Sequence, residues 1–190
     1  MVHVMGEPAQ TIPWTYEDYL AFPEDGKRYE IVEGDCYMSP APRTQHQRVS
    51  RNLLTIIHTY LRRTKIGEVF DAPADVIFSD TNIVQPDLLV ILATRTSMIT
   101  DKNIQGAPDI VIEILSETTR KTDEITKKKL YERYGVLEYW IVDPELALVK
   151  IYRLTDGRYG RAEERAQERG ETLTTVLLPG LDISLTELFA

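Results

Sequence analysis

Apolar residues recur along the chain with two different periods, which separate predicted helices from predicted strands. Residues 44–63 place apolar side chains three or four positions apart, which predicts a helix with one buried face. Residues 122–134 have the same spacing and end at Gly135, a common stop for a helix. A short helix is predicted over residues 15–21, because Thr15 and Asp18 can cap its first turn.

Two short apolar runs predict strands that are covered on both faces. Residues 87–92 are apolar after Asp87, and residues 109–115 are broken by a single charge within the strand, Glu113. Further strands are predicted at 28–33, 35–39, 68–71, 74–78, 138–142, 148–154, 158–161 and 172–176, and a last helical turn at 185–189. Strands and helices interleave, so the predicted class is α/β with a mixed central sheet flanked by helices.

The length of 190 residues fits one domain, predicted over residues 15–190 after a loose lead-in at 1–14. Cys36 is the only cysteine, which excludes an intrachain disulfide and fits a reducing, cytoplasmic location. The N-terminal residues have no apolar run after a basic start, so no signal peptide is expected. The longest apolar runs are too short to cross a bilayer, and no membrane partner is expected.

The formal net charge of −8 argues against a protein that coats nucleic acid, but it does not exclude a nuclease. Carboxylates that hold a cation count as negative, although the bound cation reverses the local field. Residues 118–135 carry an excess of three positive charges, which suggests a local contact for DNA. A second cluster of Arg62, Arg63 and Lys65 is interpreted first as a solvated face.

Glu113 is the most informative residue of the chain, because a carboxylate inside an apolar strand is costly unless something pairs with it. An exposed position at a strand end is an equally open interpretation for Glu113. Asp87, which follows Pro86 at the start of the other apolar strand, could simply cap a loop. Lys127 lies on the same helical stripe as Tyr131, so it is predicted to point inward, towards carboxylates or an anionic substrate. The alternative is a lysine that extends outward over apolar neighbours.

These residues, together with other short blocks, resemble the Uma-type family of putative restriction endonucleases, within the PD-(D/E)XK nuclease superfamily. The resemblance covers residues 15–155, and the order and spacing of the blocks make it specific. The blocks are residues 29–34, 38–42, 46–47, 85–87, 106–109 and 113–116, then Asp123, Lys127, Tyr131 and residues 135–143.

The resemblance implies a restriction-endonuclease-like fold whose metal ligands are Glu30, Asp87 and Glu113, with Asp87, Glu113 and Lys127 as catalytic residues. Mg²⁺ is the implied cofactor, with Mn²⁺ as a substitute, and no organic cofactor is expected. The superfamily lysine usually follows the second acid by two residues, where this chain has Leu115. Here its counterpart is Lys127 on the following helix. Substrate contacts are expected from His46, Gln47, Lys128 and Lys129.

The sequence therefore favours a Mg²⁺-dependent endonuclease that hydrolyses DNA phosphodiester bonds by a metal-activated water. A homodimer is expected, because two copies related by a twofold axis match the symmetry of duplex DNA. The alternative is a non-catalytic binding or assembly module that keeps the fold. A hydrolase with His46 as its base is a weaker alternative, and the aromatic residues Tyr131, Tyr139 and Trp140 are interpreted as core.

Overall fold

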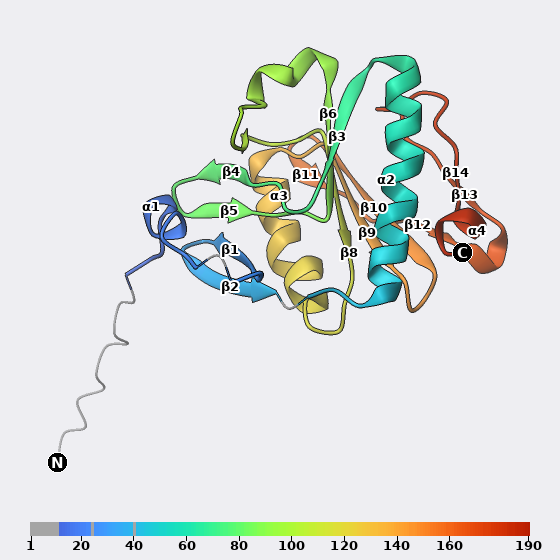
Figure 1. The fold of residues 1–190 in the computed structure, drawn as a ribbon. Helices are drawn as coiled ribbons and strands as arrows, with labels where there is room; N and C mark the ends of the chain where they lie inside the picture. The colour runs from blue at the N-terminus through green and yellow to red at the C-terminus, as the bar shows by residue number, and fades with distance from the viewer. Residues whose placement is uncertain (1–11, 24, 40) are drawn as a thin grey trace.

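The computed structural model describes residues 12–23, 25–39 and 41–190 (Figure 1). Most of the predicted lead-in therefore lies outside the described residues. Helix α1 (Tyr16–Tyr19) begins as expected, because Thr15 and Asp18 form a reciprocal capping box. Strands β1 (Arg28–Val32) and β2 (Asp35–Ser39) then form a hairpin around Glu33 and Gly34, both with positive φ. A side chain at position 34 would also collide with Pro13, whose Cβ would lie 2.5 Å from the added Cβ.

The central sheet joins seven strands in the order β11-β10-β9-β8-β6-β3, with β12 paired to β10. All pairs between neighbours are antiparallel except β8 with β9, which run parallel. The sheet is therefore mixed, as predicted. Its strands are β3 (Gly67–Asp71), β6 (Leu88–Leu92), β8 (Ile110–Ile114), β9 (Glu138–Asp143), β10 (Leu148–Thr155), β11 (Arg158–Tyr159) and β12 (Glu163–Ala166).

A second sheet of five strands, ordered β2-β1-β5-β4-β7, carries the N-terminal hairpin. Strand β5 (Asn82–Val84) pairs with β1, so Ile31 and Ile83, which are 52 positions apart along the chain, become neighbours in this sheet. The other strands are β4 (Val76–Ser79) and β7 (Ile104–Gln105). A 3₁₀ helix (Ala93–Met98) connects β6 towards β7. Strands β5, β7, β12 and β14 (Ile183–Ser184) were missed in the sequence because each is short and lacks a clear alternation.

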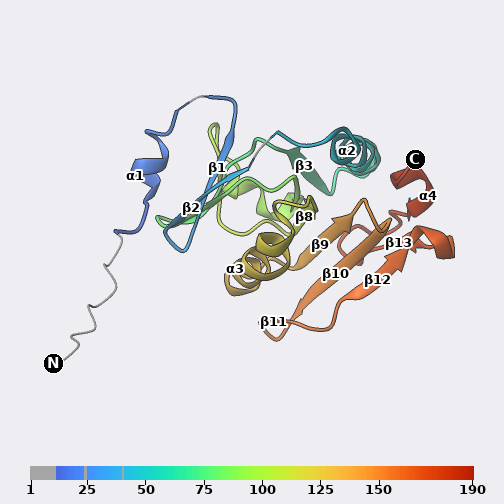
Figure 2. The ribbon, with the colours of Figure 1, turned by 90° about the horizontal axis from the view of Figure 1, so that it is seen from below.

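Two helices cover opposite faces of the central sheet (Figure 2). Helix α2 (Thr44–Thr64) buries its predicted apolar stripe against one face. The predicted helix over 122–134 forms on the other face, but its first part is a π-helix (Thr122–Lys127) that continues as α3 (Lys128–Tyr134). Alternate residues of β6 and β8 enter the two cores, which is the period-2 pattern of strands covered on both sides.

The C-terminal segment returns to the α2 side of the molecule, where the red end of the ribbon lies beside α2 (Figure 1). It contains a 3₁₀ turn (Gln167–Arg169), a hairpin of β13 (Thr172–Leu173) and β14 (Ile183–Ser184), and α4 (Leu185–Leu188). Asn52 of α2 donates to the backbone oxygens of Glu187 and Leu188. Within the described ranges, none of the helices combines the length and hydrophobicity needed to span a bilayer.

Candidate active site

Two adjacent strands bring the first pair of acids together. Leu88 of β6 lies opposite Ile112 of β8, so the antiparallel register carries Asp87 to the position opposite Glu113. Both side chains project to the α3 face, like their strand neighbours Leu89 and Val111. The Asp87 amide lies 3.4 Å from Glu113 Oε2, and both acids are buried, with 7% and 3% exposure. The interpretation of Glu113 as an exposed strand-end residue is therefore wrong.

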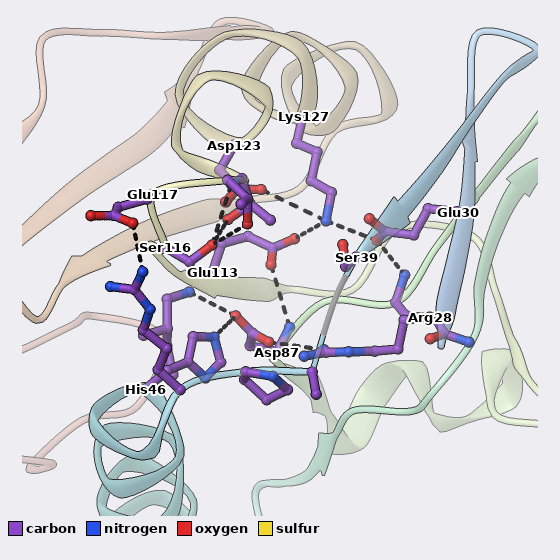
Figure 3. A pocket seen from close by; sticks show the side chains of 17 residues that line it. Arg28, Glu30, Ser39, His46, Asp87, Glu113, Ser116, Glu117, Asp123 and Lys127 are labelled. Carbon is purple, nitrogen blue, oxygen red and sulfur yellow. Dashed lines mark hydrogen bonds and ion pairs between the residues drawn. The ribbon is translucent and has the colours of Figure 1, made fainter. Parts of the chain in front are cut away.

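Lys127 points inward at these acids, as its place on the helical stripe predicted (Figure 3). Its Nζ donates to Glu30 Oε1 at 2.8 Å and to Glu113 Oε1 at 3.0 Å, and Asp123 Oδ1 lies 3.8 Å away. The lysine is 5% exposed, so it does not extend over the surface. Three acids from three different segments thus surround one ammonium group.

Asp123 and Lys127 are four positions apart and therefore lie on the same face of the helix. The segment that carries both is a π-helix, a form that is common at functional sites. Tyr131, one turn further along the same stripe, donates its hydroxyl to Glu113 Oε1 at 2.7 Å. Tyr131, Tyr139 and Trp140 are all fully buried, so their assignment to the core is confirmed. Tyr131 in addition orients Glu113, a contact that the sequence did not suggest.

Glu30 enters the site from the N-terminal hairpin. It lies on β1 and is 5% exposed. Its Oε1 accepts hydrogen bonds from Lys127 Nζ and from the backbone amide of Gln85 at 2.7 Å. Contacts with Lys127 and Gln85, both far from Glu30 in the chain, therefore place this acid of the small sheet beside the acids of the central sheet.

Asp87 has its own set of donors, distinct from those of Glu113. Its Oδ2 accepts from the Ile114 amide at 2.9 Å and contacts His46 Nε2 at 3.0 Å, while its Oδ1 accepts from Arg28 Nη1 at 3.0 Å. His46 Nδ1 is buried without a partner among the described residues. Because a carboxylate oxygen can only accept, Nε2 carries the hydrogen of the contact with Asp87.

The sequence interpretation missed the roles of two site residues, Arg28 and Gln85. The signal was present, because Arg28 and Glu30 are two positions apart on one strand and therefore share a face. Gln85 contributes through its backbone amide, which donates a hydrogen bond to Glu30.

A cavity of about 280 Å³ opens onto these groups. Its mouth carries an exposed ion pair between Arg43 and Glu117, and the polar side chains of Ser116, Thr118 and Thr119. Its lining has five acids and three lysines or arginines, so it is two charges negative when all of them are ionised and His46 is neutral. One divalent cation would cancel that excess.

Burial controls the protonation of the acids. Burial raises the pKa of Glu113 to about 8, and the nearby acids add to this effect against the opposing charge of Lys127. Burial likewise raises the pKa of Asp123 to about 6, although Lys127 opposes it. For Asp87, burial also raises the pKa, but the His46 hydrogen bond and the charges of His46 and Arg28 outweigh it and leave the pKa below its ordinary value.

Lys127 remains protonated in this environment. Burial alone would lower its pKa, but the charges of Glu113, Glu30 and Asp123 raise it well above the ordinary value. Glu113, one of the three predicted metal ligands, thus has a raised pKa in the metal-free protein beside a lysine whose pKa is also raised.

The three predicted metal ligands do not converge on one shared point. Among residues 12–23, 25–39 and 41–190, no group of three or more His, Cys, Asp or Glu side chains is arranged to hold a metal ion. The reason is that Lys127 holds Glu30 and Glu113, while Arg28 and His46 hold Asp87. The donor set nevertheless fits a hard cation, since Mg²⁺ takes oxygen ligands and needs only one or two carboxylates besides water.

The expected substrate contacts separate in the structure. His46 lines the cavity, while Gln47 lines a neighbouring one. Lys128 and Lys129 line neither: Lys128 Nζ lies 4.2 Å from the Tyr152 ring centre, and Lys129 is exposed. Of the six lysines and arginines in residues 118–135, Arg120, Lys127 and Arg133 form ion pairs within the protein.

Comparisons with known proteins found one family and a similar solved structure. The model of the Uma2 family, described as putative restriction endonuclease, matches residues 16–186. A crystal structure of a putative nuclease belonging to DUF820, from Anabaena variabilis ATCC 29413, superposes with a TM-score of 0.79. The sequence identity is 24%, over 93% of this chain and 98% of that chain, so this likeness concerns the fold. No curated protein matches the chain.

Proposed function

The chain belongs to the Uma2 family of putative restriction endonucleases, and on that premise we propose that it hydrolyses DNA phosphodiester bonds with a bound divalent cation. The observation that carries the proposal is the cross-strand pair of Asp87 and Glu113, buried beside Lys127 at the base of one cavity. A group of acids and a lysine with strongly shifted pKa values, buried beside a cavity, is typical of a catalytic site.

Asp87 and Glu113 are the proposed ligands of Mg²⁺, with Mn²⁺ as a substitute and Glu30 as the third acid. When bound, the cation would polarise a phosphoryl oxygen and lower the pKa of a water ligand. The remaining chemistry belongs to the side chains around it. Tyr131 and the Asp87 amide keep Glu113 in one orientation, and His46 and the Ile114 amide do the same for Asp87.

Lys127 is the proposed donor to the negative charge that develops on the phosphate. Its ammonium stays protonated because Glu30 and Glu113 stabilise it, and its burial keeps water away. A charged donor held in place before the substrate arrives costs little reorganisation during the reaction. Glu30 acts on this lysine from the side of the small sheet, which makes it a positioning residue as well as a candidate ligand.

The test is a plasmid-nicking assay with the full chain in Mg²⁺, in Mn²⁺ and in EDTA, beside an RNA substrate of similar length. Nicking that requires the cation and disappears in Asp87→Asn supports the proposal. The alternative, a non-catalytic binding or assembly module, would be favoured by metal-induced thermal stabilisation without nicking of either nucleic acid.

We also propose that residues 15–190 act as one domain and that two copies form a homodimer for cleavage of both DNA strands. The family match over residues 16–186 and the packing of the C-terminal segment against α2 support the first part. The second part rests on the symmetry of the substrate. Light scattering at micromolar concentration tests it, and a monomeric mass would contradict it.

A further inference from the structure

Arg28 lies on the boundary between two cavities. A second cavity of about 370 Å³ adjoins the first, and both are lined by Arg28, Pro42, His46, Gln85 and Asp87. The Arg28 side chain is 23% exposed, whereas that of Asp87 is 9% exposed. The guanidinium therefore reaches the buried acid while part of the side chain remains accessible from the cavities (Figure 3).

The two oxygens of Asp87 are used unequally. Oδ2 is occupied by the Ile114 amide and by His46, while Arg28 is the donor to Oδ1 among the described residues. A divalent cation bound at Asp87 would thus meet the guanidinium at or near the same oxygen. Two positive charges on one carboxylate oxygen repel strongly, so the ion pair and cation binding compete.

Arg28 and Lys127 differ in how easily each can move. Lys127 is surrounded by three acids and its side chain is 6% exposed, so its displacement would leave several buried charges without compensation. Within the part of the chain that the structure describes, Arg28 pairs with one acid, Asp87. Of the two, Arg28 is the cation whose release costs less, because the arriving metal would compensate that one acid.

We propose that Arg28 occupies Asp87 while no divalent cation is bound, and that cation binding releases its guanidinium to contact a substrate phosphate. This inference rests on the proposed function. A guanidinium binds phosphate oxygens through two parallel N–H groups, so it suits a phosphodiester better than an ammonium would. The second cavity offers room for a phosphate next to the scissile one, with Lys27, Gln47 and Ser50 in its lining.

The first measurement is calorimetric titration of the metal-free protein with Mn²⁺ alone, without DNA. Arg28→Gln should bind Mn²⁺ about fivefold more tightly than wild type, because a competing charge has been removed. The matched control is Arg158→Gln, which removes the same charge from an exposed position that lines neither cavity. Its Mn²⁺ affinity should stay within about twofold of wild type, since exposed distant charges are screened.

The second measurement is fluorescence anisotropy of a short labelled DNA duplex in saturating Ca²⁺, with cleavage checked on the same sample by gel. Arg28→Gln should bind the duplex about fivefold or more weakly than Arg158→Gln, since it lacks a charged contact to phosphate. Arg28→Lys keeps the charge and gives a second variant if the glutamine protein folds poorly. It should bind Mn²⁺ like wild type and DNA more weakly.

The outcomes separate the inference from the function beneath it. If wild type binds Mn²⁺ and Arg28→Gln binds it equally or more weakly, Arg28 merely supports Asp87 and the inference is overturned. Unchanged duplex binding by both Arg28 variants would overturn the phosphate contact in the same way. If wild type itself fails to bind Mn²⁺, the proposed function is overturned, and the inference with it.

Discussion

Two glutamates on neighbouring strands are buried to the same degree but surrounded in opposite ways. Glu113 of β8 is 3% exposed and Glu138 of β9 is 2% exposed. They face opposite sides of the central sheet, because Glu138 shares a face with Trp140 and Glu113 shares one with Val111. Burial alone therefore does not distinguish a structural acid from a candidate catalytic one.

The difference lies in the partners. Glu138 accepts from Arg153 Nε at 3.0 Å, from Thr175 Oγ1 at 2.8 Å and from Trp140 Nε1 at 2.8 Å, so both of its oxygens have donors. Arg153 also pairs with Glu163, but Glu163 has Arg165 as a second partner, so two arginines serve these two acids. Glu113 shares Lys127 with two other acids. The hydrogen bonds and charges around Glu138 are satisfied without a ligand. The group around Glu113 has more acids than cations, and it lines a cavity.

The largest effect that we expect is on activity. Glu113→Gln should reduce the nicking rate in Mg²⁺ about a thousandfold, because the metal supplies several kcal/mol of stabilisation and glutamine binds it poorly. The fold should persist, since glutamine keeps an acceptor for Lys127 and Tyr131. Glu68→Gln, on an exposed position of β3, is the control that should keep the wild-type rate. A Glu113→Gln protein that nicks at the wild-type rate would remove Glu113 from the catalytic residues.

The next effect is on stability, and it concerns the other glutamate. Glu138→Gln should lower the free energy of unfolding by about 2–3 kcal/mol, because an amide nitrogen must face a donor and Arg153 loses the buried one of its two counter-charges. Urea denaturation at neutral pH measures this, with Glu113→Gln beside it as the isosteric counterpart. Nicking per folded molecule should be unchanged. If the two variants lose equal stability, the contrast between the two surroundings is wrong.

A smaller effect should appear in the pH dependence of the metal-free protein. The pKa of Glu113 is raised from 4.5 to about 8, so the folded state holds a proton that the unfolded state releases. Its contribution to stability is fully present below pH 4.5 and is lost as the pH rises through 8, with a slope of at most about 1.4 kcal/mol per pH unit.

The comparison variant is again Glu113→Gln, which cannot titrate. Its stability should vary less between pH 5 and 8 than that of wild type, measured as urea midpoints in EDTA. The groups that face Glu113 and influence its pKa are Glu30, Asp87, Asp123 and Lys127, and Tyr131 donates a hydrogen bond to it. Equal slopes in the two proteins would mean that Glu113 does not hold the proton.

The smallest effect should come from a lysine that the sequence placed near the substrate. Lys128→Gln should lower stability by about 0.5 kcal/mol, the value of a cation–π contact with the half-buried Tyr152 ring. Nicking and DNA affinity should stay close to wild type, because Lys128 lines neither cavity. A marked loss of DNA affinity would return Lys128 to the substrate contacts that the sequence suggested.

The sequence by itself determined the elements with strong periods and the faces that they bury. The apolar stripe of α2, the two apolar strands β6 and β8 and the inward direction of Lys127 all follow from spacing within one element. Local rules suffice there, because residues on the same face of a helix or strand are related by a fixed rotation. The resemblance to a family added Glu30, which spacing could not select.

Only the tertiary structure decided which charges meet. Arg28 and Asp87 are 59 positions apart, and Lys127 and Glu30 are 97 apart, so no local period relates them. The π turn over Thr122–Lys127 also departs from the regular helix that the apolar spacing predicted. The partner of a buried charge depends on the packing of distant segments, and its energy changes steeply with distance in a medium of low dielectric constant. For that reason the chain indicated the acids, but the folded molecule determined that Lys127 and Arg28 stand where a metal was expected.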